Sequence, residues 1–304
     1  MKIMRTKGTI TIALCLMTIF LAIGCTTTKK ITEDIMGGGK VLKKKTAFLP
    51  IVNKTGYGGN DFQKSARAHL NTFLKRFRDD VIIIDSPKSR SLLEQVPRLP
   101  SGQLDNLSLA KLGRALGLNA VVEETLSEIE CVADNRGIWG FRNVCRLVQL
   151  SVRVRAYDIE TGAILFDDVV NDEAEVSERD WLDIKERSGY HKEVADRLLT
   201  KTTAGICKRL CEVLGNEPWK GYITSVSENT FTLIAGNDVG LAPGDILEVF
   251  GTSEPIEGQA GQFYLVSGSK IGELRTTRVH RNRAEAIGIL GSDLQKSSHV
   301  ELKR

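Results

Sequence analysis

The spacing of apolar residues divides the chain into segments with different periods. Thr46–Val52 is apolar on both alternating faces, which predicts a strand covered on both sides. Residues 61–78 carry apolar side chains at helical spacing and predict a helix. Val81–Ile84 predicts a second buried strand, and two helices follow, one after Ser86-Pro87 and one over Leu107–Leu116. This order of elements indicates an α/β arrangement.

The pattern then changes to long strands. Ala120–Cys131 and Val144–Asp158 are strand candidates, and the second alternates apolar with polar residues. That period of two is typical of an antiparallel sheet with one packed and one wet face. Glu160-Thr161-Gly162 turns the chain into a third strand, Ala163–Val170, and a long helix is predicted over Lys192–Leu214. Together these elements predict a mixed α/β domain.

Helical periodicity disappears after Trp219. Short strand-like runs alternate there with Gly, Asn and Ser turns, which predicts a small closed barrel of SH3 or OB type. Leu241-Ala242-Pro243-Gly244-Asp245 predicts a tight turn, since proline presets one backbone angle and glycine supplies a positive φ. The six predicted strands are 221–227, 230–234, 245–250, 262–266, 271–279 and 284–289.

The amino-terminal segment has the features of a targeting signal. Lys2, Arg5 and Lys7 precede a nearly uninterrupted apolar run, Ile10 to Ile23, which is too short to span a bilayer comfortably but suits a signal peptide. The run ends at Gly24-Cys25 and resembles a bacterial lipoprotein signal, in which Cys25 takes the diacylglyceryl and acyl (palmitate) groups. Simple secretion with a cut before Cys25, or an uncleaved anchor, are the alternatives.

The expected organisation has four parts. They are a signal peptide over 1–24, a polar flexible linker over 25–45, the α/β domain over 46–215 and the barrel over 216–304. Several acyl chains on Cys25 exceed what stable anchoring requires. Thr26 follows the cysteine, and by resemblance to lipoproteins with no aspartate there we expect the outer membrane, with the protein facing the periplasm.

The remaining cysteines suggest one disulfide. Cys131 and Cys145 flank a short glycine-containing segment, so a disulfide across a hairpin is reasonable in an oxidising periplasm, with two free thiols as the alternative. Cys207 and Cys211 are four residues apart in a predicted helix, where buried free thiols are expected. No Cys-x-x-Cys occurs, which excludes a thioredoxin-like motif.

Composition and charge narrow the class of protein. Apolar residues make up 41% and charged residues 26% of the 304 residues, as in a soluble globular protein. Lys plus Arg is 42 and Asp plus Glu is 38, and removing the three cations of the first 24 residues leaves 39 against 38. This near-neutral balance gives no argument for nucleic-acid binding.

Three segments carry a family resemblance. Phe48–Asn53, Gly117–Glu123 and Val152–Gly162, the last with a D-x-x-T-G turn, resemble the domain shared by the CsgG curli-secretion lipoproteins, the LpoB penicillin-binding-protein activators and the TolB amino-terminal domain. The resemblance covers 46–215 and implies an anticodon-binding/TolB-like mixed sheet. Asn237–Asp245 is similar to the carboxy-terminal module of flagellar assembly protein T.

A CsgG-like pore requires two amphipathic hairpins that insert into the bilayer. One candidate, Glu128 to Arg146, has apolar and aromatic residues at its tip, Ile138, Trp139 and Phe141. The other, Asp167 to Tyr190, is strongly acidic, and exposed charges at a bilayer midplane are expensive. A channel built in this way is therefore disfavoured, and the first tip is either a contact site for partners or folded back on the sheet.

No catalytic, cofactor or metal motif is evident. The four histidines, His69, His191, His280 and His299, are dispersed and predict structural or surface roles. Gly56-Tyr57-Gly58-Gly59 lacks the spacing of a nucleotide-binding loop. The acidic run at 167–186 lacks the residue order of a calcium loop.

These observations favour a non-enzymatic outer-membrane lipoprotein that binds envelope proteins. The expected role is assembly or scaffolding of a cell-envelope structure, such as a flagellar basal body or a secretion complex. The alternatives are a CsgG-like export channel and an LpoB-like regulator of peptidoglycan synthesis. The resemblance also implies a possible homo-oligomeric ring.

Overall fold

The computed structural model describes residues 40–74, 81–137, 143–291, 294–295 and 298–303. Within them, residues 42–303 belong to one compact unit, which contains a mixed sheet with helices and a closed barrel. The predicted signal peptide, its cysteine Cys25 and residues 25–39 of the predicted linker lie outside the described residues, as does the hairpin tip with Ile138, Trp139 and Phe141.

The sheet combines parallel and antiparallel strands in the order β3-β1-β4-β5-β6. The short strand β2 also pairs with β4, in parallel, further along that strand than β1 does. β1 pairs in parallel with β3 and β4, whereas β4, β5 and β6 are antiparallel to one another. The strands are β1 Lys44–Phe48, β2 Val52–Asn53, β3 Val81–Ile84, β4 Ala120–Arg136, β5 Asn143–Asp158 and β6 Ile164–Glu175. The predicted mixed α/β class is confirmed.

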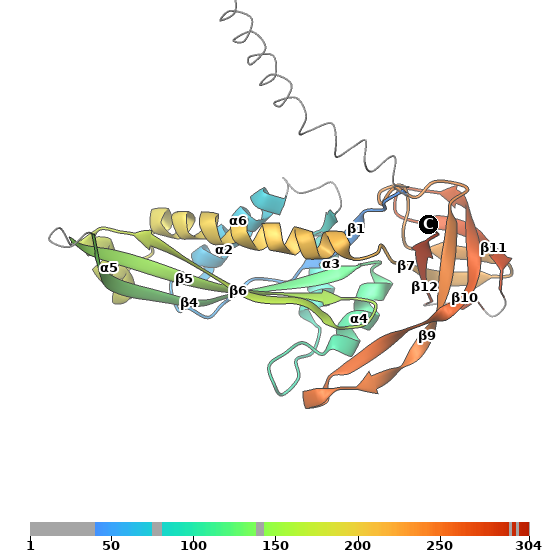
Figure 1. Cartoon of the computed structure of the whole chain (residues 1–304), viewed down its shortest axis with the longest axis horizontal. Helices are drawn as coiled ribbons and strands as arrows, with labels where there is room; N and C mark the ends of the chain where they lie inside the picture. Colours follow the sequence, from blue (N-terminus) through green and yellow to red (C-terminus); the bar gives the residue numbers. More distant parts are fainter. Residues whose placement is uncertain (1–39, 75–80, 138–142, 292–293, 296–297, 304) are drawn as a thin grey trace, which may run out of the picture. The chain divides into compact units, whose positions relative to one another are not determined.

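Helices cover both faces of the parallel part of the sheet. The first face packs on α2 Gly59–Leu74 and on α6 Lys192–Asn216, which lies along the sheet in Figure 1. The second face packs on α3 Pro87–Glu94 and α4 Asn106–Ala115. Phe48 belongs to the first core and its neighbour Ala47 to the second, which confirms that this strand is buried on both faces.

The helices begin at residues that supply capping groups. The Asp105 carboxylate accepts hydrogen bonds from the backbone N–H groups of Leu107 and Ser108 at the start of α4. Just after α4, Gly117 adopts a φ of 69°, the left-handed conformation that ends many helices. Residues next to both ends of α4 therefore determine where the helix begins and ends.

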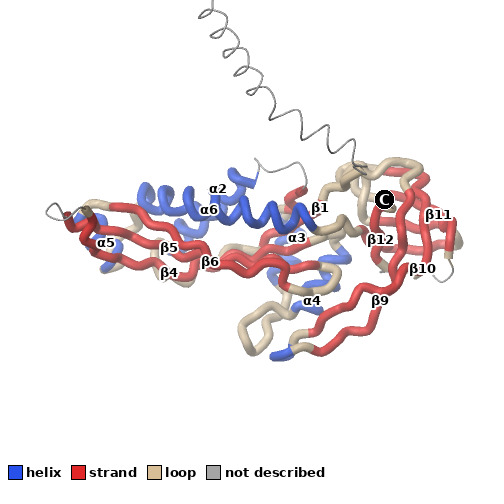
Figure 2. The backbone as a smooth tube through the Cα atoms, viewed as in Figure 1, coloured by secondary structure: helices blue, strands red, loops and turns tan. Residues whose placement is uncertain are grey.

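Six strands close the barrel in the order β10-β11-β8-β7-β12-β9. The barrel strands β9, β10, β11 and β12 are labelled at the right of Figures 1 and 2. They are β7 Gly221–Ser227, β8 Thr230–Leu233, β9 Ile246–Glu257, β10 Phe263–Val279, β11 Ala284–Leu290 and β12 His299–Leu302, with a short 3-10 turn, η1, at Gln259–Gly261. The predicted closed barrel is confirmed, but its strand assignment is corrected. Runs 262–266 and 271–279 form one strand, and the sixth strand is β12.

The barrel core contains a residue that precedes the sheet. Leu42 is 2% exposed and packs with Val239 and Leu241, while the Lys43 backbone N–H donates to the Val239 carbonyl at 2.8 Å. β1 begins at Lys44, so the strand starts two residues inside the segment that the sequence predicted as a linker. Both lysines have polar partners that allow burial: Lys44 Nζ donates to the Gly215 carbonyl at 2.8 Å, and Lys45 Nζ lies 2.9 Å from Asp238.

Candidate functional site

The D-x-x-T-G segment forms a tight turn after β5. Asp158 accepts hydrogen bonds from the Thr161 backbone N–H at 3.0 Å and from the Thr161 hydroxyl at 2.7 Å. Gly162 has a φ of 73°, and a side chain there would also come within 3.3 Å of Asn106. The turn predicted from the sequence is confirmed.

This turn and α4 both contact the barrel. The Thr161 carbonyl accepts a hydrogen bond from the Leu265 backbone N–H on β10 at 2.8 Å. Asn106 binds the same strand twice, since its amide donates to the Phe263 carbonyl at 2.6 Å and its oxygen accepts from the Phe263 N–H at 3.1 Å. The Asn106 side chain thus forms the pair of backbone hydrogen bonds that a neighbouring strand would form. These bonds hold β10 against the α/β part.

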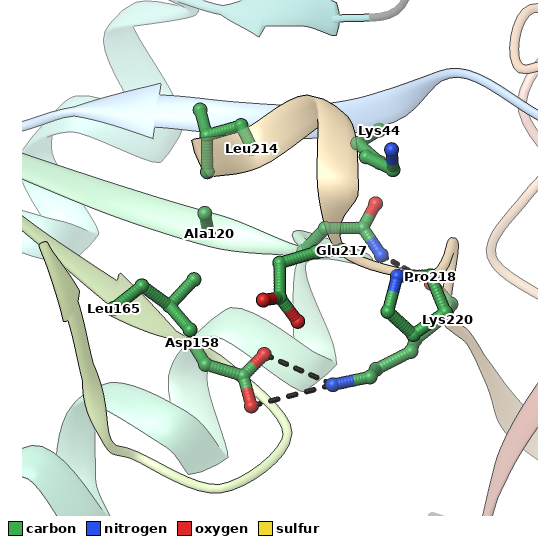
Figure 3. A pocket seen from close by; sticks show the side chains of 9 residues that line it. Lys44, Ala120, Asp158, Leu165, Leu214, Glu217, Pro218 and Lys220 are labelled. Carbon is green, nitrogen blue, oxygen red and sulfur yellow. Dashed lines mark hydrogen bonds and ion pairs between the residues drawn. The ribbon is translucent and has the colours of Figure 1, made fainter. Parts of the chain in front are cut away.

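Buried polar groups join the two parts beside this turn. Lys220 Nζ lies 3.2 and 3.3 Å from the two oxygens of Asp158, as Figure 3 shows. Asn119 donates to the Lys220 carbonyl at 2.8 Å and accepts from the Lys45 backbone N–H at 2.9 Å. Because one amide satisfies backbone groups of both parts, its loss leaves two buried groups without partners.

The cavity beside these residues is very small. Its volume is about 10 Å³, which corresponds to about one water molecule and is far below the size of a small-molecule site. The residues that line it are Lys44, Asn119, Ala120, Asp158, Leu165, Leu214, Glu217, Pro218 and Lys220.

A second buried cluster surrounds Glu160 in the same turn. His299 Nδ1 lies 2.9 Å from the Glu160 carboxylate, and both side chains are at most 3% exposed. The His299 ring stacks on Phe250 with centroids 4.8 Å apart and an interplanar angle of 6°. Arg114 Nη2 donates to the Glu160 carbonyl at 2.5 Å and lies 3.3 Å from its carboxylate. These contacts connect α4 and the turn with β12.

The pKa values of His299 and of Tyr222, whose ring centroid lies 5.9 Å from the Arg114 guanidinium carbon, are both shifted in this cluster. Burial lowers the pKa of the His299 imidazole, but the hydrogen bonds to Glu160 and Glu301 outweigh burial, so the net shift is upward. Burial raises the pKa of the Tyr222 phenol well above its usual value, and the Glu160 and Asp158 charges add to this. We refer to the contacts of Asp158, Glu160 and Thr161 with the barrel as the junction.

The face of the sheet that carries the polar residues of β5 has a series of ion pairs, which runs from the buried Glu123 to more exposed side chains. The Nε and Nη2 groups of Arg153 donate to the two carboxylate oxygens of Asp167, each at 2.7 Å, and Arg155 Nε donates to the same carboxylate at 3.2 Å. Glu123 accepts from Arg98 at 2.7 Å and lies 3.5 Å from Arg155. The polar residues of the alternating pattern in β5 therefore pair with neighbouring strands and with the segment after α3.

The acidic segment Asp167 to Tyr190, which a pore would need as its second hairpin, forms the end of a strand and a helix and not a hairpin. β6 ends at Glu175, and residues Glu178–Lys185 form helix α5, capped by the Ser177 hydroxyl, which accepts from the Asp180 N–H. Trp181 of α5 donates from its indole N–H to the Val132 carbonyl at 3.3 Å on β4. The helix forms because its apolar residues return to the edge of the sheet.

The predicted disulfide between Cys131 and Cys145 is also absent, since both thiols are free. On the antiparallel ladder Cys131 pairs with Val148 and Cys145 pairs with Asp134. The two cysteines are thus offset by three residues, about 10 Å along the strands, beyond the reach of a disulfide. Cys207 is a buried free thiol, as predicted, and burial raises its pKa to about 12.

Sequence reasoning missed three buried lysines and the buried acid Glu124. Lys44, Lys45 and Lys220 are charged side chains at most 8% exposed, and Glu124 is 4% exposed on the face of β4 that packs on α2 and α6. Burial raises the pKa of Glu124 to about 7, and Arg67 opposes that shift. The signal was present as charged residues beside apolar runs, but a sequence does not reveal which partners approach them.

Within the described ranges, no group of three or more His, Cys, Asp or Glu side chains has a metal-binding arrangement. Among the helices of those same ranges, none is long and apolar enough to cross a membrane.

No family model and no curated protein matches the chain. Solved structures with a related arrangement include the hypothetical protein CT253 from Chlamydia trachomatis, at 15% identity, covering 58% of this chain and 99% of that one with a TM-score of 0.38. The lipoprotein GNA1162 from Neisseria meningitidis is similar at 12% identity, covering 54% and 99% with a TM-score of 0.32. The LpoB carboxy-terminal domain from Salmonella enterica is similar at 11% identity, covering 47% of this chain and 91% of that one with a TM-score of 0.26. These values describe a distant likeness and decide neither fold family nor function.

Proposed function

We propose that this protein is a non-enzymatic lipoprotein of the outer membrane, which faces the periplasm and serves as an assembly or scaffold component of an envelope structure. The observation that carries the proposal is the amino-terminal pattern: cations at Lys2, Arg5 and Lys7, a short apolar run, and Gly24-Cys25 at its end. Acyl chains on Cys25 hold a folded part against the membrane.

The chemistry of the junction supports binding in preference to catalysis. Its ionisable groups are already used in holding the barrel: Asp158 faces Lys220, and Glu160 faces His299 and Arg114. The adjoining cavity has room for about one water molecule. A carboxylate–histidine pair without space for a substrate acts as a structural tie.

The long edge of the sheet offers a surface for partners. β6 pairs with β5, and its other edge has no strand beside it among the described residues. Two cations of α6 bind carbonyls near the end of β6: Lys201 reaches Glu173 at 2.9 Å and Arg197 reaches Glu175 at 3.1 Å. Such side chains discourage unspecific strand pairing, and the preceding part of β6 is where a partner strand adds.

The anchor is tested by metabolic labelling with palmitate and by membrane fractionation of the full chain. We expect label in the wild type and in Cys145→Ala, which is the matched control because it removes a thiol from a described strand. Cys25→Ala is expected to lose the label and to leave the acylated membrane fraction. Absence of label in the wild type, with unchanged sedimentation of Cys25→Ala, refutes the lipid anchor.

The scaffold role is tested separately by cross-linking in cells and mass spectrometry of the captured proteins. A scaffold predicts a reproducible set of envelope proteins, and capture that depends on the β6 edge. The change Val169→Lys tests that edge, because Val169 is 45% exposed there and an added lysine opposes strand addition. Recovery of lipid alone under several conditions contradicts the scaffold role while leaving the anchor intact.

A further inference from the structure

We propose that the turn between β10 and β11 binds the phosphate groups of anionic phospholipids in the leaflet that holds the anchor. The inference rests on the lipid anchor proposed above and adds a second, electrostatic contact between the folded part and the membrane. We call residues His280, Arg281, Asn282 and Arg283, together with Lys43, the basic turn.

The basic turn belongs to a local concentration of positive charge in a chain that is nearly neutral. Residues 275–283 contain four arginines and a histidine, and residues 274–284 contain no acid. The five residues of the basic turn are all exposed. Two guanidinium groups, those of Arg281 and Arg283, and the Lys43 ammonium have no ion pair with any described residue.

The acids nearest to the turn are already neutralised. Glu285 pairs with Arg278 at the base of the hairpin. Asp238 lies 2.9 Å from Lys45 Nζ and also accepts the backbone N–H groups of Gly236 and Val239, at 3.2 and 2.9 Å. The remaining cations therefore face solvent without local compensation, which favours an anionic partner outside the chain.

Hydrogen bonds place the basic turn beside the point where the described chain begins. The backbone N–H groups of Asn237 and Asp238 donate to the carbonyls of His280 and Arg281, both at 2.9 Å, and the next residue, Val239, accepts from Lys43 at 2.8 Å. The loop 236–239 is thus bound on one side by the turn and on the other by the entering chain.

The close fit of this loop needs a glycine. A side chain at Gly236 would bring its first carbon to 2.1 Å from the His280 carbonyl oxygen and 2.6 Å from that of Arg281. Because the backbones of the loop and the turn are in direct contact, the distance between the basic turn and the entering chain is set by structure.

The length of chain between the anchor and the turn limits how far the turn can be from the membrane. Lys43 is 18 residues after Cys25, so even a fully extended segment keeps it within about 60 Å of the anchored cysteine. A cation close to an anionic bilayer surface contributes about fivefold to partitioning. Lipid phosphates are the anions that the anchor itself brings within reach.

The test places a donor dye on the turn and an acceptor on the lipid headgroups. The full chain carries a clickable amino acid at Asn282, an exposed position, so that the native cysteines stay unlabelled. It is reconstituted into phosphatidylcholine vesicles, or into vesicles in which about a third of the lipid is phosphatidylglycerol. Energy transfer is measured at about 0.1 M and about 1 M salt, where the screening length falls from about 10 to about 3 Å.

We expect transfer to rise with phosphatidylglycerol and to fall again at high salt. Arg281→Gln with Arg283→Gln is expected to weaken partitioning of the turn about thirty-fold, and the corresponding Glu pair to weaken it further. The matched control is Lys88→Glu with Lys111→Glu, which equals the Glu pair in net charge change, lies on α3 and α4 and is exposed. Equal thermal unfolding midpoints verify that the variants are folded.

Two outcomes overturn the inference: transfer that is independent of phosphatidylglycerol in the wild type, or loss of that dependence in the control as large as in the turn variants. Failure of the anchor gives a different result, because the full chain then does not sediment with phosphatidylcholine vesicles. Separate measurements therefore test the lipid anchor and the binding of lipid phosphates by the basic turn.

Discussion

The buried acid on β4 makes a quantitative prediction about stability. Glu124 is 4% exposed and lies between Val122 and Leu126, on the face that packs on α2 and α6. Burial raises the pKa of its carboxyl group from 4.5 to about 7, and the nearest opposing influence is the charge of Arg67. Arg67 is itself partly buried, which lowers its pKa, and it donates to the Leu49 carbonyl at 2.9 Å.

The sign of the effect follows from proton binding. The folded protein holds a proton on Glu124 between pH 4.5 and about 7, where an exposed glutamate in the unfolded chain has lost it. The free energy of unfolding therefore falls as the pH rises through this window. Each pKa unit corresponds to about 1.4 kcal/mol, so the whole loss is about 3 kcal/mol.

Glu124→Gln removes this ionisation and keeps the shape of the side chain. We expect its free energy of unfolding to exceed that of the wild type by about 3 kcal/mol at about pH 8 and to equal it at about pH 4. Urea unfolding of the full chain at both pH values measures the difference. Glu128→Gln is the matched control, since Glu128 is exposed on the same strand.

The reasoning is refuted if Glu124→Gln has the same stability as the wild type at about pH 8, or if its stability depends on pH as steeply as that of the wild type. A gain of equal size in Glu128→Gln would also refute it, because the effect would then stem from net charge and not from burial.

Two further predictions concern buried polar contacts in the junction and beside it. Asn119→Ala is expected to destabilise the full chain by about 2–4 kcal/mol, because it leaves buried backbone groups of Lys45 and Lys220 without partners; urea unfolding measures this, and a loss below about 0.5 kcal/mol contradicts it. His299 has a raised pKa in the folded state, so its contact with Glu160 stabilises most below about pH 6.5 and is lost as the pH rises through the folded value. In a Glu124→Gln background, His299→Gln should therefore destabilise more at low than at high pH, and an equal loss at both contradicts the assignment.

Local patterns sufficed to predict much of the α/β part. The alternation in β5 predicted its packed face, and Val148, Leu150, Val152 and Val154 are at most 1% exposed. The helical spacing before residue 74 and the cap at Asp105 are likewise local. These elements were predictable because a single periodicity and nearby turn residues determine them.

Most errors in the predicted barrel strands arise because strand pairing there joins residues that are far apart in the sequence. The sequence predicted separate strands over 262–266 and 271–279, yet the intervening Ser267-Gly268-Ser269 lies within β10, where the pairing with β9 shifts register. A side chain at Gly268 would bring its first carbon within 2.3 Å of the Gly251 carbonyl oxygen, so this glycine permits close strand approach. β12 is only four residues long, and its pairing with β7 and β9 depends on a barrel closed elsewhere.

The buried lysines show a different reason for failure. A polar run before Thr46 is typical of a linker, and only the approach of Asp238 and Gly215 from distant parts of the chain makes Lys45 and Lys44 suitable for a strand. The sequence shows a charge but not its partner. Similarly, the offset of Cys131 from Cys145 is a matter of register, which their spacing alone does not define.

The junction gives the proposed membrane contact a consequence for the whole compact unit. Asp158, Glu160 and Thr161 of the D-x-x-T-G turn bind Lys220, His299 and Leu265, respectively. Buried charge pairs such as Asp158–Lys220 tolerate little displacement, because a displaced partner leaves a buried charge unpaired. Asp238 also pairs with Lys45 of β1, so the loop beside the basic turn is bound to the sheet. A basic turn held at lipid phosphates therefore orients the sheet as well as the barrel, and the β6 edge is presented to partners in a defined direction from the membrane.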